Sequence, residues 1–261
     1  MKRNWVGALA VAAVMVSAAP GALAEPTVGF ETDYVITVRG LTVAKAHFTG
    51  KVEGSRFEVA GSLRSAGLAR IFDKTEAKSR SVGTLANGTP QPERFLLSYA
   101  QGGSGGKKME ISFRNGDVAR ITHEPELGPP GDDLVPVAKS DLKSVTDPIS
   151  ATIVARGSAE DICRRTLRIY EGGTRVDVQL SPVSVGWVYG AGNGAATCSA
   201  RFVPVAGYIK SSTYDYMRDH ADMEFVYVPT HRQGLYMLHS ISTRTDIGQV
   251  KLRAWKQKVT G

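Results

Sequence analysis

The chain has 261 residues and a formal net charge of +7 at pH 7. This length is enough for a sizeable core in one or two domains. The charge does not indicate nucleic-acid binding, because the lysines and arginines are dispersed and form no basic stripe interleaved with stacking aromatic residues. A modest positive excess suits solubility near an anionic lipid or polymer.

The N-terminus has the pattern of a secretory signal peptide. Lys2 and Arg3 supply positive charge, residues 5–16 form an apolar run, and residues 22–24 (Ala-Leu-Ala) offer the small side chains that a signal peptidase requires. We therefore expect residues 1–24 to be a signal peptide cleaved after Ala24, and residues 25–261 to form a single β-rich periplasmic domain. Without Lys2 and Arg3 the net charge falls from +7 to +5.

A membrane-spanning helix is the alternative interpretation of the same apolar run. Ser17 and Pro20 interrupt the run before it reaches the roughly 20 apolar residues that a bilayer requires. No cysteine follows the cleavage site to carry a lipid, and no later stretch is apolar enough to span a membrane. The sequence therefore predicts an exported protein of a Gram-negative periplasm without a transmembrane anchor in the mature chain.

Alternation of apolar and polar residues with a period of two predicts strands with one buried and one solvated face. In the first half of the chain this pattern places nine side chains inward: Tyr34, Ile36, Val38, Phe57, Val59, Leu63, Met109, Ile111 and Phe113. Turn residues separate these strands at Gly40, Glu53-Gly54, Asn87-Gly88 and Asn115-Gly116.

One helix is expected in the middle of the chain. Asp147 followed by Pro148 is typical of a helix N-cap with proline at the first helical position. Ile149 and Ile153 give a short apolar face, and Gly157 ends the segment. Two neighbouring segments are expected to be a loop at residues 124–136 and a second short turn capped by Ser158.

Strand patterns return in the second half. Residues 167–180 predict a hairpin around Gly172-Gly173, with Arg175, Asp177 and Gln179 facing outward. Further strands are expected around Cys198 to Phe202 and at residues 225–228, 235–243 and 249–255. Many short antiparallel strands with regular turns favour a mainly β fold, an open barrel or β-spiral with one or two short helices, and a sandwich is the second choice.

Cys163 and Cys198 are the only cysteines in the chain. In an oxidising compartment such a pair indicates a disulfide, which closes a loop of about thirty-five residues and stabilises the chain by roughly 3–4 kcal/mol. Free thiols are the alternative. A redox-active pair usually has the close C-x-x-C spacing, which is absent here.

Two glycine-rich segments superficially suggest nucleotide binding. Residues 102–107 lack the first glycine of a phosphate-binding loop and have Lys108 where Ser or Thr should hold magnesium, so a flexible hairpin loop is the better interpretation. Residues 190–194 precede a strand rather than the helix that a dinucleotide fold requires. We expect no cofactor.

Candidate catalytic and metal-binding residues are few. Ser140 and Lys143 have the S-x-x-K spacing of penicillin-binding enzymes, but the companion motifs are missing and a capped turn explains the residues better. His220 and Asp222 are two potential metal ligands in close sequence, for which a surface turn is preferred. The other histidines are His47, His123, His231 and His239. We therefore assign no catalytic, cofactor-binding or metal-binding residue.

Several motifs lie in an order and spacing that resemble a known bacterial envelope family, catalogued as domain of unknown function 3108. They are YVITVRGLTVAKAHF at 34–48, TDPISA at 146–151, LRIYEGGTRVDVQL at 167–180 after Cys163, and CSARFVPVAGY at 198–208. The similarity covers residues 30–255. It implies a curved, open β-barrel or β-spiral of the kind seen in periplasmic envelope-integrity proteins and, loosely, in lipoprotein carriers. The turn at 171–175 departs from the family, which more often places Asp-Gly and basic residues there, while Arg175 and Asp177 are kept.

The resemblance implies no catalytic residues, because the family has none established. An open curved sheet leaves an apolar inner face that a helix, a ligand or another chain must fill. We therefore expect a non-enzymatic envelope protein that binds a lipid-like molecule or a protein partner on its curved sheet. The alternatives are a scaffold without a ligand and a hydrolase or transferase acting on cell-wall or lipid substrates, for which Ser140, Lys143, His220 and Asp222 are the candidates.

Overall fold

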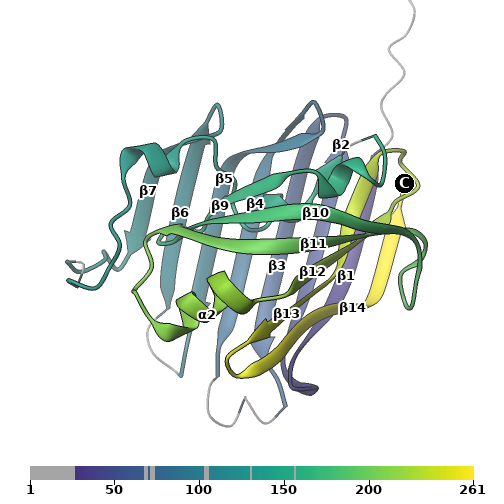
Figure 1. Ribbon diagram of the computed structural model, residues 1–261. Coiled ribbons are helices and arrows are strands. Elements are labelled where there is room, and N and C mark those ends of the chain that lie inside the picture. Colours follow the sequence, from purple (N-terminus) through teal and green to yellow (C-terminus); the bar gives the residue numbers. More distant parts are fainter. Residues whose placement is uncertain (1–26, 68–69, 71–73, 103–105, 130, 156) are drawn as a thin grey trace, which may run out of the picture.

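The computed structural model describes residues 27–261 except 68–69, 71–73, 103–105, 130 and 156, so the predicted signal peptide lies outside the described residues. The first half of the chain is a meander of seven strands (Figure 1). These are β1 (Val28–Val38), β2 (Leu41–Glu53), β3 (Arg56–Ser65), β4 (Glu76–Ala86), β5 (Thr89–Ala100), β6 (Lys107–Arg114) and β7 (Asp117–Glu124).

The second half begins with short turns of 3-10 helix and continues with longer strands. The elements are η1 (Lys139–Leu142), η2 (Ser150–Thr152), β8 (Val154–Ala155), η3 (Asp161–Cys163), β9 (Thr166–Tyr170), β10 (Arg175–Val188), β11 (Gly192–Ala206), α2 (Ser212–His220), β12 (Met223–Pro229), β13 (Leu235–Thr245) and β14 (Gly248–Thr260). In the described part of the chain, no helix is long and apolar enough to cross a membrane.

All strands belong to one sheet, in the order β7-β6-β5-β4-β3-β2-β1-β14-β13-β12-β11-β10-β9, with β8 beside β13. Each neighbouring pair is antiparallel, and the two end strands, β7 and β9, do not pair with each other. The sheet curls so that β9, β10 and β11 run across the face of the first-half strands (Figure 1). The predicted open antiparallel barrel is therefore confirmed, and the alternative of a two-sheet sandwich is wrong.

The first-half strands form for the reason that the sequence predicted. Phe57 and Val59 in β3, and Met109, Ile111 and Phe113 in β6, are buried, while their neighbours face the solvent. The turns at Asn87-Gly88 and Asn115-Gly116 have positive φ at both residues, as tight hairpins between twisted strands require.

The gap between the two ends of the sheet is filled by the connection between β7 and β9. We name its part at residues 137–155 the plug. Val145 of the plug packs with Phe95 of β5, Ile111 of β6 and Tyr170 of β9. Ile153 packs with Val52 of β2 and Phe57 of β3. The backbone of Thr146 bridges to Ile169 in β9, and the Val145 N–H donates to the carbonyl of Gly116 at 2.8 Å. The plug therefore joins both edges of the sheet to one interior.

The expected position of the α-helix is wrong. Asp147 does accept hydrogen bonds from the backbone N–H groups of Ile149 and Ser150, both at 2.9 Å, but the turn that follows is a three-residue 3-10 helix, and Val154 then enters β8. The α-helix of the described residues lies instead at Ser212–His220 and has no buried residue.

Arg175 was expected to face outward and faces inward. Its side chain is 1% exposed, forms an ion pair with Asp177 at 2.7 Å, and donates from Nε to the carbonyl of Asp141 at 3.1 Å. The carbonyl of Asp141 lies in the 3-10 turn η1 and accepts this hydrogen bond from the buried guanidinium, whose charge is balanced by Asp177. Arg175 therefore ties the second-half hairpin to the plug.

Candidate ligand-binding site

An apolar cavity of about 130 Å³ lies inside the curled sheet, between the first strands, the last strands and the plug. Its wall is almost entirely hydrocarbon. The lining residues are Phe30, Thr32, Tyr34, Phe48, Val52, Val59, Ile149, Thr152, Ile153, Leu235, Tyr236, Met237, Leu238, Ile241 and Leu252. An apolar void of this kind stays dry and accepts apolar guests.

The cavity exists because β13 separates from β14 partway along its length. In β13, only residues Ser240 to Thr245 pair with β14. The carbonyl of Leu238 therefore accepts no backbone hydrogen bond from β14. Two side chains supply hydrogen bonds instead: the Tyr34 hydroxyl donates to the Leu238 carbonyl at 2.7 Å, and the Gln257 amide donates to it at 3.1 Å. The separated strands leave room for the cavity without leaving this buried carbonyl unpaired.

Two ionisable groups beside the cavity are held in their neutral forms. Burial raises the pKa of the Tyr34 hydroxyl. Burial lowers the pKa of the His239 imidazole, the hydrogen bond that the imidazole donates to the Gln257 Oε1 atom opposes that effect, and the nearby charges of Arg253 and Lys251 lower the pKa further. The residues that line the cavity include no Asp, Glu, Lys, Arg or His, so the cavity suits an uncharged, apolar guest.

The plug wall of the cavity is anchored by a buried carboxylate. Asp147 is fully buried and accepts hydrogen bonds at its Oδ2 atom from the hydroxyls of Ser81 in β4, at 2.8 Å, and Ser150, at 2.6 Å. With the two backbone N–H donors of Ile149 and Ser150, this makes four hydrogen bonds to one carboxyl group. Burial raises its pKa, and the hydrogen bonds from Ser150, Ser81 and Ile149 lower it. Asp147 thus fixes the plug to the first-half sheet.

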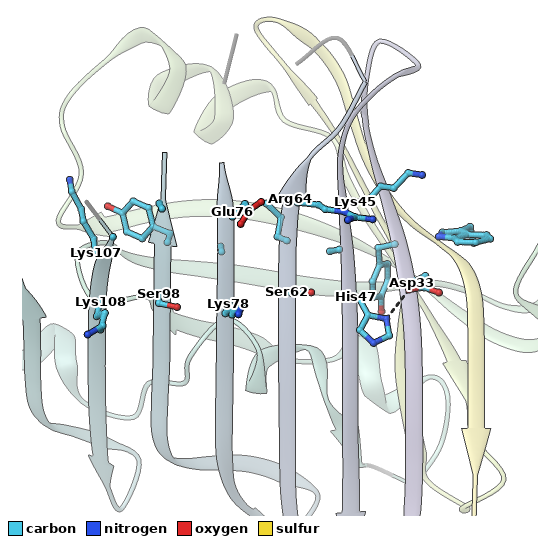
Figure 2. A pocket seen from close by; sticks show the side chains of 18 residues that line it. Asp33, Lys45, His47, Ser62, Arg64, Glu76, Lys78, Ser98, Lys107 and Lys108 are labelled. Carbon is cyan, nitrogen blue, oxygen red and sulfur yellow. Dashed lines mark hydrogen bonds and ion pairs between the residues drawn. The ribbon is translucent and has the colours of Figure 1, made fainter. Parts of the chain in front are cut away.

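A second hollow lies on the outer face of β1 to β6 (Figure 2). It is a shallow groove of about 780 Å³ whose floor contains a row of successive cross-strand partners, Asp33, His47, Ser62, Lys78, Ser98 and Lys108. His47 pairs with Asp33 at 2.8 Å, and Lys108 pairs with Glu124 at 3.3 Å. The charges of the groove are mixed, so the interior cavity with its apolar lining is the better candidate for a ligand site.

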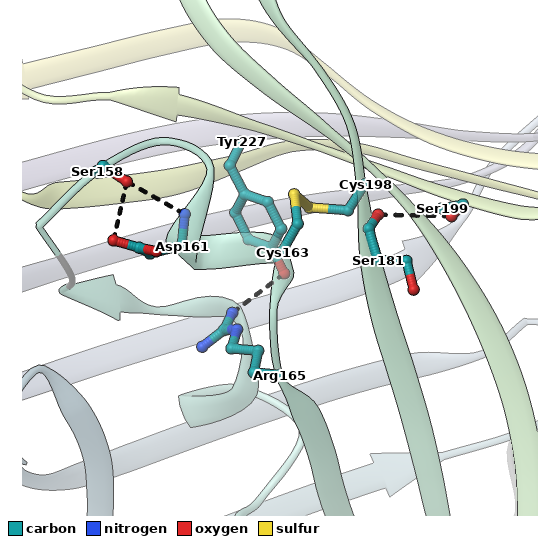
Figure 3. Close-up of a disulfide and its surroundings, with 8 residues drawn as sticks. All are labelled: Ser158, Asp161, Cys163, Arg165, Ser181, Cys198, Ser199 and Tyr227. Atoms are coloured by element: carbon teal, nitrogen blue, oxygen red, sulfur yellow. Dashed lines mark hydrogen bonds between the residues drawn. A yellow bond between two sulfur atoms is a disulfide. The ribbon is translucent and has the colours of Figure 1, made fainter.

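The predicted disulfide is present. Cys163 and Cys198 are joined with Cα atoms 5.3 Å apart across a sequence separation of 35, and both are almost fully buried. The bond connects η3 to β11 and packs against Tyr227 in the main core cluster (Figure 3). No redox chemistry is indicated by its surroundings, and it fastens the chain after the plug to the second-half sheet.

The structure does not bring the candidate catalytic residues together. Ser140 and Lys143 lie at the 3-10 turn η1, as the capped-turn interpretation predicted. His220 is the last residue of α2, and Asp222 lies between α2 and β12; both are exposed. Among the described residues, no group of three or more His, Cys, Asp or Glu side chains is placed to hold a metal ion.

Both glycine-rich segments join paired strands. The first connects β5 to β6, although residues 103–105 lie outside the described part, and the second forms the turn between β10 and β11. The first connects two strands of a hairpin, as predicted, and the second precedes a strand, as predicted, and begins it at Gly192. The sequence interpretation missed Ser81, which lies in β4 and meets Asp147 only in the folded chain. A small polar residue at an inward position of a strand was the one signal available.

The fold and the cavity define an open, curled antiparallel β-barrel whose apolar interior is closed by a plug. A family described as "Protein of unknown function (DUF3108)" matches residues 33–254, and the chain belongs to that family. Among solved structures, the chain is similar to a β-barrel-like protein of domain of unknown function DUF1849 from Brucella abortus, with 9% sequence identity, a TM-score of 0.49, and coverage of 90% of this chain and 98% of that chain. A comparison with curated proteins finds no match.

Proposed function

We propose that this chain is a non-enzymatic protein of the periplasmic cell envelope that binds the apolar part of a lipid-like ligand inside its curled sheet. The observation that carries this proposal is the hydrocarbon-lined cavity between β1–β3, β13–β14 and the plug. A close-packed protein of this size has little reason to keep such a void, because each unfilled volume forfeits packing contacts. A ligand that fills the void recovers them.

The volume limits what the closed form accepts. An engineered apolar cavity of about 150 Å³ binds benzene, so the 130 Å³ cavity suits one small apolar group, such as the end of an acyl chain. Ile149, Thr152 and Ile153 of the plug form one of its walls. A longer chain therefore enters only as these plug residues move outward.

The plug has the properties that such a movement requires. Its regular elements are short 3-10 turns and the two-residue strand β8, so its backbone hydrogen bonds to the rest of the molecule are scattered and form no long continuous ladder. Besides its apolar packing, it is attached to the first-half sheet by separate hydrogen bonds, which include the bond between Ser81 and Asp147, the bond from the Val145 N–H to the Gly116 carbonyl and the bond from the Ser144 N–H to Asp117. A ligand replaces the Ile149 and Ile153 side chains in the interior with equivalent hydrocarbon, so the apolar area buried changes little.

The test is mass spectrometry of apolar molecules extracted from the mature protein purified from its own periplasm. We expect about one apolar ligand per chain. In a Leu252→Phe variant, whose larger side chain fills the cavity, we expect most of that ligand to be lost. Gln249→Phe is the matched control, because Gln249 is exposed on the same strand β14, and it should retain the ligand. Wild-type protein without an extractable apolar ligand would contradict the proposal, and so would equal retention in both variants.

A further inference from the structure

The far half of the β10–β11 hairpin exposes a run of large apolar side chains. Val183 is 61% exposed, Val185 42%, Trp187 66% and Tyr189 76%. The Trp187 and Tyr189 rings are arranged edge to face, with their centroids 6.3 Å apart. Contiguous apolar patches are rare on soluble monomers and usually mark an interaction surface. Trp and Tyr are also the residues that favour the boundary between lipid and water.

The hairpin is suited to contact through side chains rather than through its backbone. β9 pairs with β10 only at residues 175–179, so the rest of β10 is an open sheet edge. Pro182 and two register shifts, at Pro182/Ser184 and Gly186/Val188, interrupt that edge. Such interruptions discourage the addition of another strand, and this argues against a strand of a partner protein as the occupant.

The far half of the hairpin also contains no charge. Residues 179–200 include no Asp, Glu, Lys, Arg or His. Partial entry of this segment into an apolar phase therefore desolvates no ionic group, which would be the costly step.

A basic strand lies beside this uncharged half of the hairpin. Residues 247–261 contain Lys251, Arg253, Lys256 and Lys258 and no Asp or Glu, together with Trp255, which is 60% exposed. Glu31 and Asp33 of β1 lie opposite Lys258 and Lys256 in the sheet, and Asp33 is already paired with His47. The strand therefore keeps a net positive charge.

The two features share one side of the molecule. Val188 and Ala191 at the hairpin tip pack in the same apolar cluster as Val259 of β14. Gly190 of the tip lies against His239, whose pKa is lowered in part by the charges of Arg253 and Lys251. Figure 1 shows the β10–β11 turn on the side where β14 and the C-terminus lie.

We infer that this side of the molecule, the β10–β11 hairpin with the exposed face of β14, docks on the surface of an anionic lipid bilayer. Trp187 and Tyr189 insert at the level of the lipid headgroups, and the cations of β14 contact the lipid phosphates. Aromatic side chains combined with a basic patch are the two signals that stable interfacial binding requires. The inference concerns the outside of the molecule and stands independently of the interior cavity.

The tryptophans make this surface directly measurable. The chain has three, Trp5, Trp187 and Trp255, so the chain that begins at residue 25 keeps two, and both lie on the proposed surface. With vesicles of phosphatidylcholine and phosphatidylglycerol, we expect their emission to move to shorter wavelength and the protein to co-sediment. Vesicles of phosphatidylcholine alone should bind at least about tenfold more weakly, and added salt should weaken binding to the anionic vesicles.

Two variants separate the contributions. Trp187→Ala/Tyr189→Ala should lower binding to anionic vesicles at least about tenfold, measured by co-sedimentation. Replacing Lys251, Arg253, Lys256 and Lys258 with Gln should remove the preference for anionic lipid. The matched control is Tyr99→Ala/Leu127→Ala, which truncates two exposed apolar side chains elsewhere and should bind like the wild type. Circular dichroism melting curves verify that each variant is folded.

Three results would overturn the inference. The first is equal binding to neutral and anionic vesicles, and the second is unchanged binding by the aromatic double variant. The third is a concentration-dependent emission shift without vesicles that the double variant abolishes, because it would assign the surface to a second copy of the chain. None of these three results depends on whether the protein carries a ligand in its interior cavity.

Discussion

The two halves of the sheet bury their side chains in different ways. Strands β2, β3 and β6 alternate between buried and exposed residues, as one-sided strands do. In β13, by contrast, six consecutive residues from Leu235 to Ser240 are buried. One face of β13 packs on the disulfide core cluster, and Met237 on the other face packs with Val188 and Ala191 of the hairpin tip. The strands of the second half therefore pack around a core cluster of their own, whereas the strands of the first half bury their inward side chains against the plug.

The largest expected effect lies in the second half. Removing the disulfide with Cys163→Ala/Cys198→Ala should lower the free energy of unfolding by about 4 kcal/mol, because the unfolded chain regains the freedom of a 35-residue loop. Urea denaturation of the purified variant measures this. Ser199→Ala, at an exposed neighbour of Cys198, should cost less than about 0.5 kcal/mol. If the disulfide variant were as stable as the wild type, the conclusion that the main core of the protein lies in the second half would be wrong.

The next effect tests the attachment of the first half to the plug. Asp147→Ala removes four hydrogen bonds and leaves buried donors unpaired, so it should lower the free energy of unfolding by about 3 kcal/mol. Asp161→Ala is the matched control, since Asp161 accepts similar bonds from Ser158 but is exposed. The control should cost at most about 1 kcal/mol. Equal costs would show that the buried anchor has no special role.

The same carboxyl group gives the anchor a pH dependence. Burial raises the pKa of Asp147, so the folded chain keeps the proton at a pH where the unfolded chain has lost it. Its contribution to stability is therefore present at low pH and is lost as the pH rises through the pKa of the folded state. Asp147→Asn cannot ionise, so its free energy of unfolding should improve relative to the wild type as the pH rises. A difference that does not change with pH would contradict this.

The smallest expected effect concerns Tyr34 of β1, whose hydroxyl donates a hydrogen bond to the Leu238 carbonyl of β13. Tyr34→Phe removes the hydrogen bond to the Leu238 carbonyl, while Gln257 still donates to the same oxygen. We expect a loss of about 1 kcal/mol in the free energy of unfolding. Tyr189→Phe, at a hydroxyl that is exposed, should cost nothing measurable. A loss for both variants would show that the effect is general to tyrosine and does not arise at the separated strands.

The sequence predicted those parts of the fold that local patterns determine. Alternation located the strands, Asn-Gly pairs located two hairpins, and the cysteine pair located the disulfide. The helix expected after Asp147 ends after one 3-10 turn because Val154 and Ala155 pair with β13, a distant partner that no local pattern reveals. Helix α2 escaped notice because it buries no apolar face, although Ser211 caps it and Asp215 pairs with Arg218.

For the candidate site, the sequence predicted an apolar inner face of the sheet but not the position of the cavity. The inward positions Tyr34 and Val59 were identifiable as apolar wall residues. The cavity itself depends on where β13 leaves β14 and on how far Ile149 and Ile153 of the plug reach inward. Both are consequences of pairing between segments far apart in the chain, and alternation does not encode them. The inward turn of Arg175 has the same origin, because its partner Asp141 lies in the plug.

The most direct test of the interior site is a titration of ligand-stripped mature protein with a fluorescent acyl-chain probe, comparing the wild type with Leu252→Phe and Gln249→Phe. The account predicts saturable binding of one probe per chain by the wild type and by Gln249→Phe, and binding at least about tenfold weaker by Leu252→Phe, since the added ring occupies the volume the probe needs. Equal affinity in all three proteins, or no saturable binding by the wild type, would contradict an apolar ligand site in the interior.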